Sequence, residues 1–191
     1  DVDIAAGVPR ERAEVVVRPE GVVEVVIGTL SSGQGHETSF AQLITHWMGV
    51  DLDQVQIVTG DTDRVKAGGG SHAGRSMRLA GVVIGKAAET VIERAKRIAV
   101  HVLGAEYGAI TLSNGRFFAG LENRYLDLFQ IAAYAMDDPS TPEDLQGPLA
   151  GIRDEVSQAA GFPFGSHVCE VEIDPETGQL SIVNYVAVDD V

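Results

Sequence analysis

Two glycine-rich segments carry the side chains in this sequence that are best suited to hold a ligand. The first is Gly33-Gln34-Gly35-His36, and the second is Gly69-Gly70-Ser71-His72-Ala73-Gly74-Arg75-Ser76. Their glycines let a backbone approach a flat or charged group closely, and their amide and hydroxyl groups can donate hydrogen bonds without titrating. Each segment is expected to run from a strand into a helix, where unpaired backbone N–H groups favour an anion. Together they predict a site for a phosphate-bearing ligand.

The same residues have other interpretations. The second segment matches the P-loop spacing G-x-x-x-x-G-K-[ST] except that Arg75 replaces lysine, and residues 60–68 separate it from the preceding strand. A zinc site is disfavoured because His36, Glu37 and His46 do not form H-E-x-x-H. It also stays open that the glycines of either segment only permit tight turns.

Composition and charge narrow the class of protein. The chain has 191 residues, 45% of them hydrophobic, which is enough to bury a core as one domain or two small lobes. Its formal net charge of -14 argues against a general nucleic-acid binder. No apolar run reaches the roughly 18 residues of a membrane span, so we expect no membrane insertion and a cytoplasmic location. The single cysteine, Cys169, cannot form a cysteine-rich metal site.

Positive charge is concentrated between residues 64 and 97, which hold eight of the 14 basic residues. Arg94, Lys96 and Arg97 are expected on a solvated helix face, because exposure is the norm for these residue types. Arg75 and Arg78 lie where the glycine-rich loop runs into a helix, and they are therefore candidates to contact an anionic ligand.

Residue patterns predict the elements that position both segments. β-Branched runs flank Pro19-Glu20-Gly21, a turn sequence, and apolar residues recur at helical spacing after His36 and after Ser76, which is expected to be an N-cap. The predicted order is strand 13–18, strand 22–29, helix 36–48, strand 54–59 and helix 76–103.

The remainder is predicted to be rich in hairpins. Asn114-Gly115 indicates a hairpin within residues 110–118, and Asp127 is expected to cap a short helix. The other predicted features are helix 128–136, a long surface excursion over residues 137–161, and strands 168–174 and 179–188. The predicted fold is α+β: a mixed sheet with two main helices on one face, followed by a hairpin-rich part, with possible sub-lobes 1–104 and 105–191.

Four motifs in order resemble the large, molybdenum-binding subunit of the molybdenum hydroxylases. They are Gly33-Gln34-Gly35-His36-Glu37-Thr38, Gly60-Asp61-Thr62-Asp63, the GGGSHAGRS loop, and CEVEIDPETGQLSIVNYVAVDDV at the end of the chain. The family includes xanthine dehydrogenase, aldehyde oxidoreductases and aerobic carbon monoxide dehydrogenase. The resemblance extends from about Pro9 to Val191, so residues 1–191 look like an excised segment of a larger subunit.

The resemblance implies a molybdopterin cofactor with molybdenum, in the cytosine dinucleotide form for a bacterial protein. In the family the Gly-Gln-Gly segment lies beside the metal. This maps to Gln34, which would hydrogen-bond an oxo ligand or the pterin. The metal is held by the cofactor's sulfurs, so no protein ligand to it is expected. The residues that the resemblance assigns to cofactor binding are Gly33, Gln34, Gly35, His36, Ala73, Gly74, Arg75 and Ser76.

The resemblance also implies an activity and partners for the parent protein. Family members oxidise an aldehyde, an N-heterocycle or carbon monoxide with water-derived oxygen, and they pass electrons to iron–sulfur and flavin subunits or domains. Their catalytic glutamate would lie outside this segment, so the isolated segment is expected to be inactive. The alternative is a small nucleotide-binding or regulatory module that uses the same glycine-rich loops for an anion.

Overall fold

A computed structural model describes residues 10–72, 74–120, 124–156 and 164–189 of the chain. The chain divides into two compact units, residues 1–158 and residues 159–191. The sub-lobe boundary expected at residue 104 differs from this division, because residues beyond it complete the sheet of the first unit.

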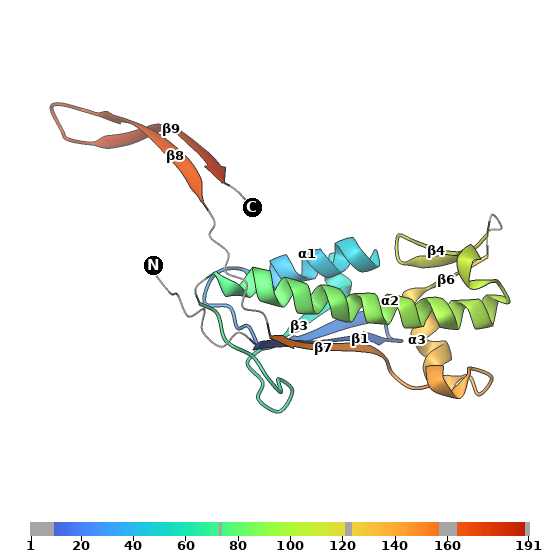
Figure 1. The fold of residues 1–191 in the computed structure, drawn as a ribbon. Helices are drawn as coiled ribbons and strands as arrows, with labels where there is room; N and C mark the ends of the chain where they lie inside the picture. Colours follow the sequence, from blue (N-terminus) through green and yellow to red (C-terminus); the bar gives the residue numbers. More distant parts are fainter. Residues whose placement is uncertain (1–9, 73, 121–123, 157–163, 190–191) are drawn as a thin grey trace. The chain divides into compact units, whose positions relative to one another are not determined.

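A four-stranded mixed sheet forms the base of the first unit (Figure 1). Its strands are β1 (Arg10–Arg18), β2 (Val22–Ile27), β3 (Val55–Val58) and β7 (Leu149–Val156), in the spatial order β3-β2-β1-β7. β1 runs antiparallel to β2 and to β7, whereas β2 and β3 are parallel. The predicted hairpin is confirmed, and Gly21 takes the positive φ of 95° that its turn requires.

Strand β7 corrects the prediction of a surface excursion over residues 137–161. Its residues pair with β1, with Val15 opposite Gly151. The glycine that suggested a loop is needed for packing, because a Cβ on Gly151 would lie 2.2 Å from the backbone oxygen of Ala87 in the helix above. Residues 138–148 do form a connection, which contains the short 3-10 turn η4 (Glu143–Leu145), and residues 157–161 lie outside the described residues.

Two helices pack side by side on one face of the sheet, as predicted (Figure 1). Helix α1 (His36–Met48) ends at Gly49, whose φ of 71° is the left-handed conformation typical of a helix end. Helix α2 (Gly81–Leu103) follows the π-helical turn η2 (Ser76–Ala80). The prediction of Ser76 as N-cap is wrong. Ser76 is the first residue of η2, and its hydroxyl contacts Ser71.

The core lies between these helices and the sheet. Alternate residues of β1 and β2 face it and are fully buried, and they meet one apolar stripe from each helix. The innermost members include Val15, Val25, Phe40, Ile44, Ile84 and Val91. This arrangement confirms the α+β class.

The rest of the first unit follows the predicted signals, with one additional strand. β4 (Ile110–Ser113) and β5 (Arg116–Ala119) form the hairpin at Asn114-Gly115, and β6 (Tyr125–Asp127), which was not predicted, extends their sheet. Helix α3 (Leu128–Asp137) begins as predicted, because the Asp127 carboxylate accepts a hydrogen bond of 2.8 Å from the backbone N–H of Gln130.

The second unit is the predicted hairpin of β8 (Gly165–Ile173) and β9 (Leu180–Asp189). Its residues are exposed along both strands, including a series of large apolar side chains. Among the described residues of the whole chain, no helix has the length and apolar character needed to cross a membrane.

Candidate functional site

The two glycine-rich segments meet at one cavity of about 330 Å³. The sequence predicted each segment as a ligand loop but did not show that they share a site. The first segment contributes the two residues that flank and begin α1, and the second contributes the loop that leads into η2. The lining residues are Gln34, His36, Ser71, His72, Gly74, Ser76 and Met77.

A chain of hydrogen bonds joins the two segments across the cavity. The amide Nε2 of Gln34 donates to the hydroxyl of Ser71 over 3.0 Å, and the hydroxyls of Ser71 and Ser76 are 2.9 Å apart. The backbone N–H of Ser32 donates to Oε1 of Gln34, which fixes the other end of the amide. The side chain of Gln34 is exposed, so these bonds hold it at the rim of the cavity instead of in the core.

His36 lines the cavity and carries a buried ring nitrogen with an unmet hydrogen-bonding requirement. Its side chain is 4% exposed, and its ring stacks on Phe40 with 5.1 Å between centroids. Among the described residues, no group hydrogen-bonds to its buried Nδ1. A buried polar atom without a partner is costly, so a ligand that hydrogen-bonds to Nδ1 would gain affinity there.

The glycines of these loops fall into two groups, which differ in why glycine is needed at each position. Gly33, Gly35 and Gly74 have φ values of 116°, 72° and 63°, and a Cβ on any of them would meet no atom within 4 Å. They shape turns and leave the space beside the loops open. Gly68 and Gly69 are needed for packing: added Cβ atoms would lie 2.4 Å from the Cα of Gly28 and 2.5 Å from the Arg75 guanidinium carbon, respectively.

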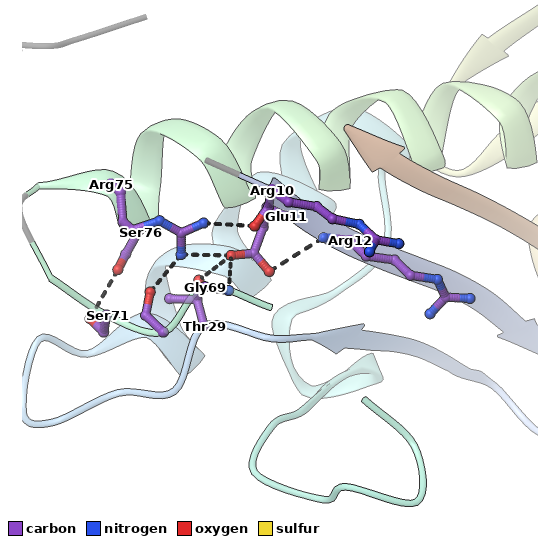
Figure 2. A network of polar contacts seen from close by, with 9 residues as sticks. Arg10, Glu11, Arg12, Thr29, Gly69, Ser71, Arg75 and Ser76 are labelled. Carbon is purple, nitrogen blue, oxygen red and sulfur yellow. Dashed lines mark hydrogen bonds and ion pairs between the residues drawn. The ribbon is translucent and has the colours of Figure 1, made fainter. Parts of the chain in front are cut away.

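Arg75 does not present its guanidinium to the cavity. Its side chain is fully buried, and Nη1 lies 2.8 Å from the carboxylate Oε2 of Glu11 (Figure 2). Nη1 also donates to the backbone oxygen of Gly70 over 2.6 Å. The predicted phosphate contact therefore has no support from this side-chain position. Ala73, another predicted cofactor residue, lies outside the described residues.

The same ion pair distinguishes this loop from the phosphate-binding P-loop of nucleotide triphosphatases. The residue that replaces the P-loop lysine is Arg75, whose charge is neutralised by Glu11. In addition, β3 ends at Val58, and a long connection precedes η2. The geometry thus lacks, among the described residues, the cation that a P-loop directs at the terminal phosphates.

The other basic residues have different surroundings. Arg94 corrects the prediction of a solvated side chain, since its guanidinium donates to the backbone oxygens of Leu145, Gln146, Gly147 and Pro148. Burial lowers its pKa, with the nearby charge of Arg97 acting in the same direction. Arg97 itself pairs with exposed Asp144, and Lys96 lies over the Tyr107 ring. Arg78 lies in a separate groove beside Leu43 and Trp47.

Sequence reasoning missed Glu11 and gave no role to Ser71 or Met77. A signal for Glu11 was present, because it occupies the same register of β1 as the buried residues Ala13 and Val15. A carboxylate at an inward position of a strand predicts a buried cationic partner. The proximity of Ser71 to Gln34 depends on tertiary folding, and no local pattern indicates it.

The comparisons with known proteins agree with one another. A family model described as "Molybdopterin cofactor-binding domain" matches residues 3–191. The chain is 32% identical over 181 residues to the carbon monoxide dehydrogenase large chain of Afipia carboxidovorans, covering 94% of this chain and 22% of that protein. It is 34% identical over 176 residues to the 6-hydroxypseudooxynicotine dehydrogenase complex subunit gamma of Paenarthrobacter nicotinovorans, covering 92% and 22%.

Solved structures show the same likeness in three dimensions. The crystal structure of a Cu,Mo-CO dehydrogenase matches with a TM-score of 0.80 and 31% identity, over 94% of this chain and 22% of that one. Quinoline 2-oxidoreductase from Pseudomonas putida 86 matches with a TM-score of 0.77 and 30% identity, over 94% and 23%. The chain thus spans about a fifth of the length of these relatives. The resemblance to molybdenum hydroxylases is confirmed, and the chain belongs to the family of molybdopterin cofactor-binding domains.

Proposed function

We propose that the cavity between the two glycine-rich segments binds molybdopterin carrying molybdenum, in its cytosine dinucleotide form. The observation that carries this proposal is that His36, whose buried Nδ1 has no hydrogen-bond partner among the described residues, lines the same cavity as Gln34 and Ser76. Family membership supplies the class of ligand. The cavity supports this location for the ligand within the chain.

The chemistry of the lining residues fits this group. A pterin has both donor and acceptor atoms along its edges, and the cavity offers an amide, two hydroxyls and two imidazoles, all neutral or able to be neutral. The open space beside Gly33, Gly35 and Gly74 leaves room for a flat ring against the backbone. The N-terminus of α1 favours a phosphate through its unpaired N–H groups.

The roles of the residues follow from their positions. The bound cofactor would supply two-electron redox chemistry, as is usual for enzymes in which a cofactor carries the reaction. Gln34 would donate its amide N–H to the cofactor from the rim of the cavity without changing protonation state. His36 would hydrogen-bond through Nδ1, and Ser76 would donate or accept through its hydroxyl. These residues bind and orient the cofactor.

For the parent protein we propose an oxidoreductase that oxidises an aldehyde, an N-heterocycle or carbon monoxide with water-derived oxygen. The relatives are larger than this chain and act as large subunits or complex components by name. We place the catalytic glutamate outside residues 1–191 and expect the segment by itself to be inactive. Iron–sulfur and flavin subunits would accept the electrons in the cytoplasm. The remainder of the large subunit would cover the exposed apolar side chains of β8 and β9.

The test uses the full-length parent protein. Molybdenum is measured by elemental mass spectrometry, the pterin by fluorescence after oxidative release, and the nucleotide by hydrolysis and chromatography. The variant His36→Phe keeps a ring to stack on Phe40 and removes Nδ1. The matched control is His46→Phe, the same substitution at an exposed position of the same helix.

We expect pterin, molybdenum and cytidine monophosphate in the wild-type protein and in the control. His36→Phe should retain the thermal midpoint and bind the pterin about tenfold more weakly, since a lost hydrogen bond in a buried site costs about 1–3 kcal/mol. Absence of pterin from the wild-type protein would refute the proposal. Full pterin retention by His36→Phe would remove His36 from the site.

A further inference from the structure

A buried ion pair includes Arg75, which lies in sequence between the cavity residues Gly74 and Ser76. Glu11 of β1 is 1% exposed and Arg75 is fully buried, with 2.8 Å between carboxylate Oε2 and guanidinium Nη1 (Figure 2). Buried charges of this kind are rare and need further hydrogen bonds to offset their lost hydration. Both side chains have such bonds.

The Glu11 carboxylate joins the ends of β1 and β2 to the glycine-rich loop. Its Oε2 accepts hydrogen bonds from the Thr29 hydroxyl over 3.0 Å and from the backbone N–H of Gly69 over 3.5 Å. Its Oε1 accepts from the backbone N–H of Arg12 over 3.3 Å. The carboxylate therefore links β1, on which it lies, to two segments that are distant in sequence, at Thr29 and at Gly69.

Arg75 completes the connection from the other side. Its Nη1 donates to the backbone oxygen of Gly70 over 2.6 Å, and its Nη2 donates to the backbone oxygen of Arg10 over 3.0 Å. The face of the guanidinium is covered by Gly69, where any side chain would collide with it. This pair of side chains thus holds the loop at Gly69, at Gly70 and at Arg75 itself.

The held residues are sequence neighbours of the cavity residues. Ser71 follows Gly70 and Ser76 follows Arg75, and their hydroxyls are the two that meet at 2.9 Å. Ser71 also receives the hydrogen bond from Gln34. A displacement of the loop at Gly70 or Arg75 would therefore separate the groups that line the cavity, because no intervening residue can absorb it.

We infer that Glu11 and Arg75 are a positioning pair that holds loop residues 69–72 and 74–76 in the shape that binds the cofactor. This inference rests on the proposed function. Stability alone does not require such a pair, since apolar side chains of similar volume often replace a buried ion pair at no loss of stability. An apolar pair would fill the space. It could not hydrogen-bond to Thr29, to Gly69 and to the carbonyls of Gly70 and Arg10, and so could not hold these segments together.

The test compares three variants of the full-length parent protein. Glu11→Gln keeps the shape of the side chain and removes its charge. The double variant Glu11→Leu with Arg75→Met replaces the pair by apolar groups and leaves no unpaired charge. Glu14→Gln is the matched control, since Glu14 lies on the same strand, is partly exposed and pairs with Arg12 away from the loop. Each is assayed for thermal midpoint, for the rate of pterin loss during dialysis, and for amide hydrogen exchange of residues 68–77.

We expect the double variant to fold, with a lower thermal midpoint because the Gly70 and Arg10 carbonyls lose their donor, and to lose pterin about 10- to 100-fold faster, as for residues that orient the ligands of a bound group. Its hydrogen exchange should rise in residues 68–77 and stay unchanged in α2. Glu11→Gln should lose pterin at least as fast, and the control should match the wild-type protein.

Three results would overturn the inference. The first is a double variant that keeps its pterin as the wild-type protein does. The second is faster exchange spread over the whole first unit, and the third is a double variant that does not fold, because either would make the pair a general requirement of the fold. A wild-type protein without pterin would instead refute the proposed function itself, so the two failures are distinguishable.

Discussion

Gln34 shows how an exposed residue can be functional without being part of the core. Its amide bridges the two loops through Ser71 and through the backbone of Ser32, and neither bond is buried. Removal of this side chain should therefore leave the fold intact. Its effect should be confined to the ligand and to the relative placement of the loops.

The first prediction concerns Gln34→Ala in the full-length parent. Turnover should fall by about one to two decades, which corresponds to a hydrogen bond of about 1.5–3 kcal/mol to a charged or polarised group that is made mainly in the transition state. Steady-state kinetics normalised to molybdenum content separates this effect from cofactor loss. Gln42→Ala, at an exposed position of α1, is the control and should have wild-type turnover. Equal turnover of both variants would contradict a role for Gln34.

Arg94 leads to a second prediction, about stability. Alanine at this position leaves the backbone oxygens of residues 145–148 without their shared donor, so the thermal midpoint of the parent protein should fall by an amount equivalent to about 1–3 kcal/mol. Lysine should restore little, because an ammonium lacks the planar fork of donors. Arg97→Ala, which breaks only an exposed pair with Asp144, should change the midpoint much less. If Arg94→Ala and Arg97→Ala have equal thermal midpoints, the hydrogen bonds from Arg94 to the backbone oxygens do not stabilise the fold.

The residues of the site differ in how far sequence could predict them. Gln34, His36 and Ser76 were predicted from local composition and family resemblance, and the structure brings them to one cavity. The inward direction of Arg75 was not predictable locally, since it is decided by Glu11, sixty-four residues earlier. Arg94 was misread for the same reason: its partners are carbonyls more than fifty residues away.

At the scale of elements, the sequence predicted helix starts and turns correctly where all the interacting residues are close together in the chain. Asp127 and Gln130 form a capping box within four residues, and Asn114-Gly115 forms the turn of its own hairpin. The sequence did not predict strand β7, because its partner β1 is far away in sequence, at the start of the first unit, and because Gly151 resembles a loop residue. The packing against α2 that requires this glycine is invisible in the sequence.

A third prediction tests that packing. Gly151→Ala should destabilise the protein by on the order of 1–3 kcal/mol, because the added Cβ would overlap the backbone oxygen of Ala87 and push α2 from β7. Gly81→Ala is the matched control within α2, where an added Cβ would be 3.8 Å from Leu43 in ordinary contact. Helix propensity should make the control more stable by about 0.5–1 kcal/mol. We therefore expect the thermal midpoint to fall for Gly151→Ala and to rise for Gly81→Ala, relative to the wild-type protein. A higher midpoint for Gly151→Ala would contradict this packing.

At the scale of the whole molecule, carboxyl groups predict a loss of stability in acid. A hydrogen bond from Arg10 lowers the pKa of Asp154, and the backbone N–H of Ser140 lowers that of Asp138. For Glu24, burial acts to raise the pKa, but the hydrogen bonds from Arg64 and Arg18 outweigh it, so that the pKa is lowered. Each group thus contributes stability that is present above its unfolded pKa and lost as the pH falls through its folded pKa.

The thermal midpoint should accordingly be steady at neutral pH and fall as the pH drops below about 4, near the unfolded values of carboxyl groups. A series of thermal scans between pH 3 and pH 7 in buffers of equal ionic strength measures it. A midpoint that rises on acidification would show that the repulsion within this strongly acidic chain outweighs these pairs.

The location of the cofactor in the full-length parent tests the central claim most directly. A cryo-electron microscopy or crystal structure of the protein purified with its cofactor should show the pterin in the cavity lined by Gln34, His36 and Ser76, within hydrogen-bonding distance of His36 Nδ1. The Glu11–Arg75 pair should remain behind the loop, with the guanidinium directed away from the phosphate. A pterin bound elsewhere, with this cavity filled by protein or solvent alone, would contradict the account.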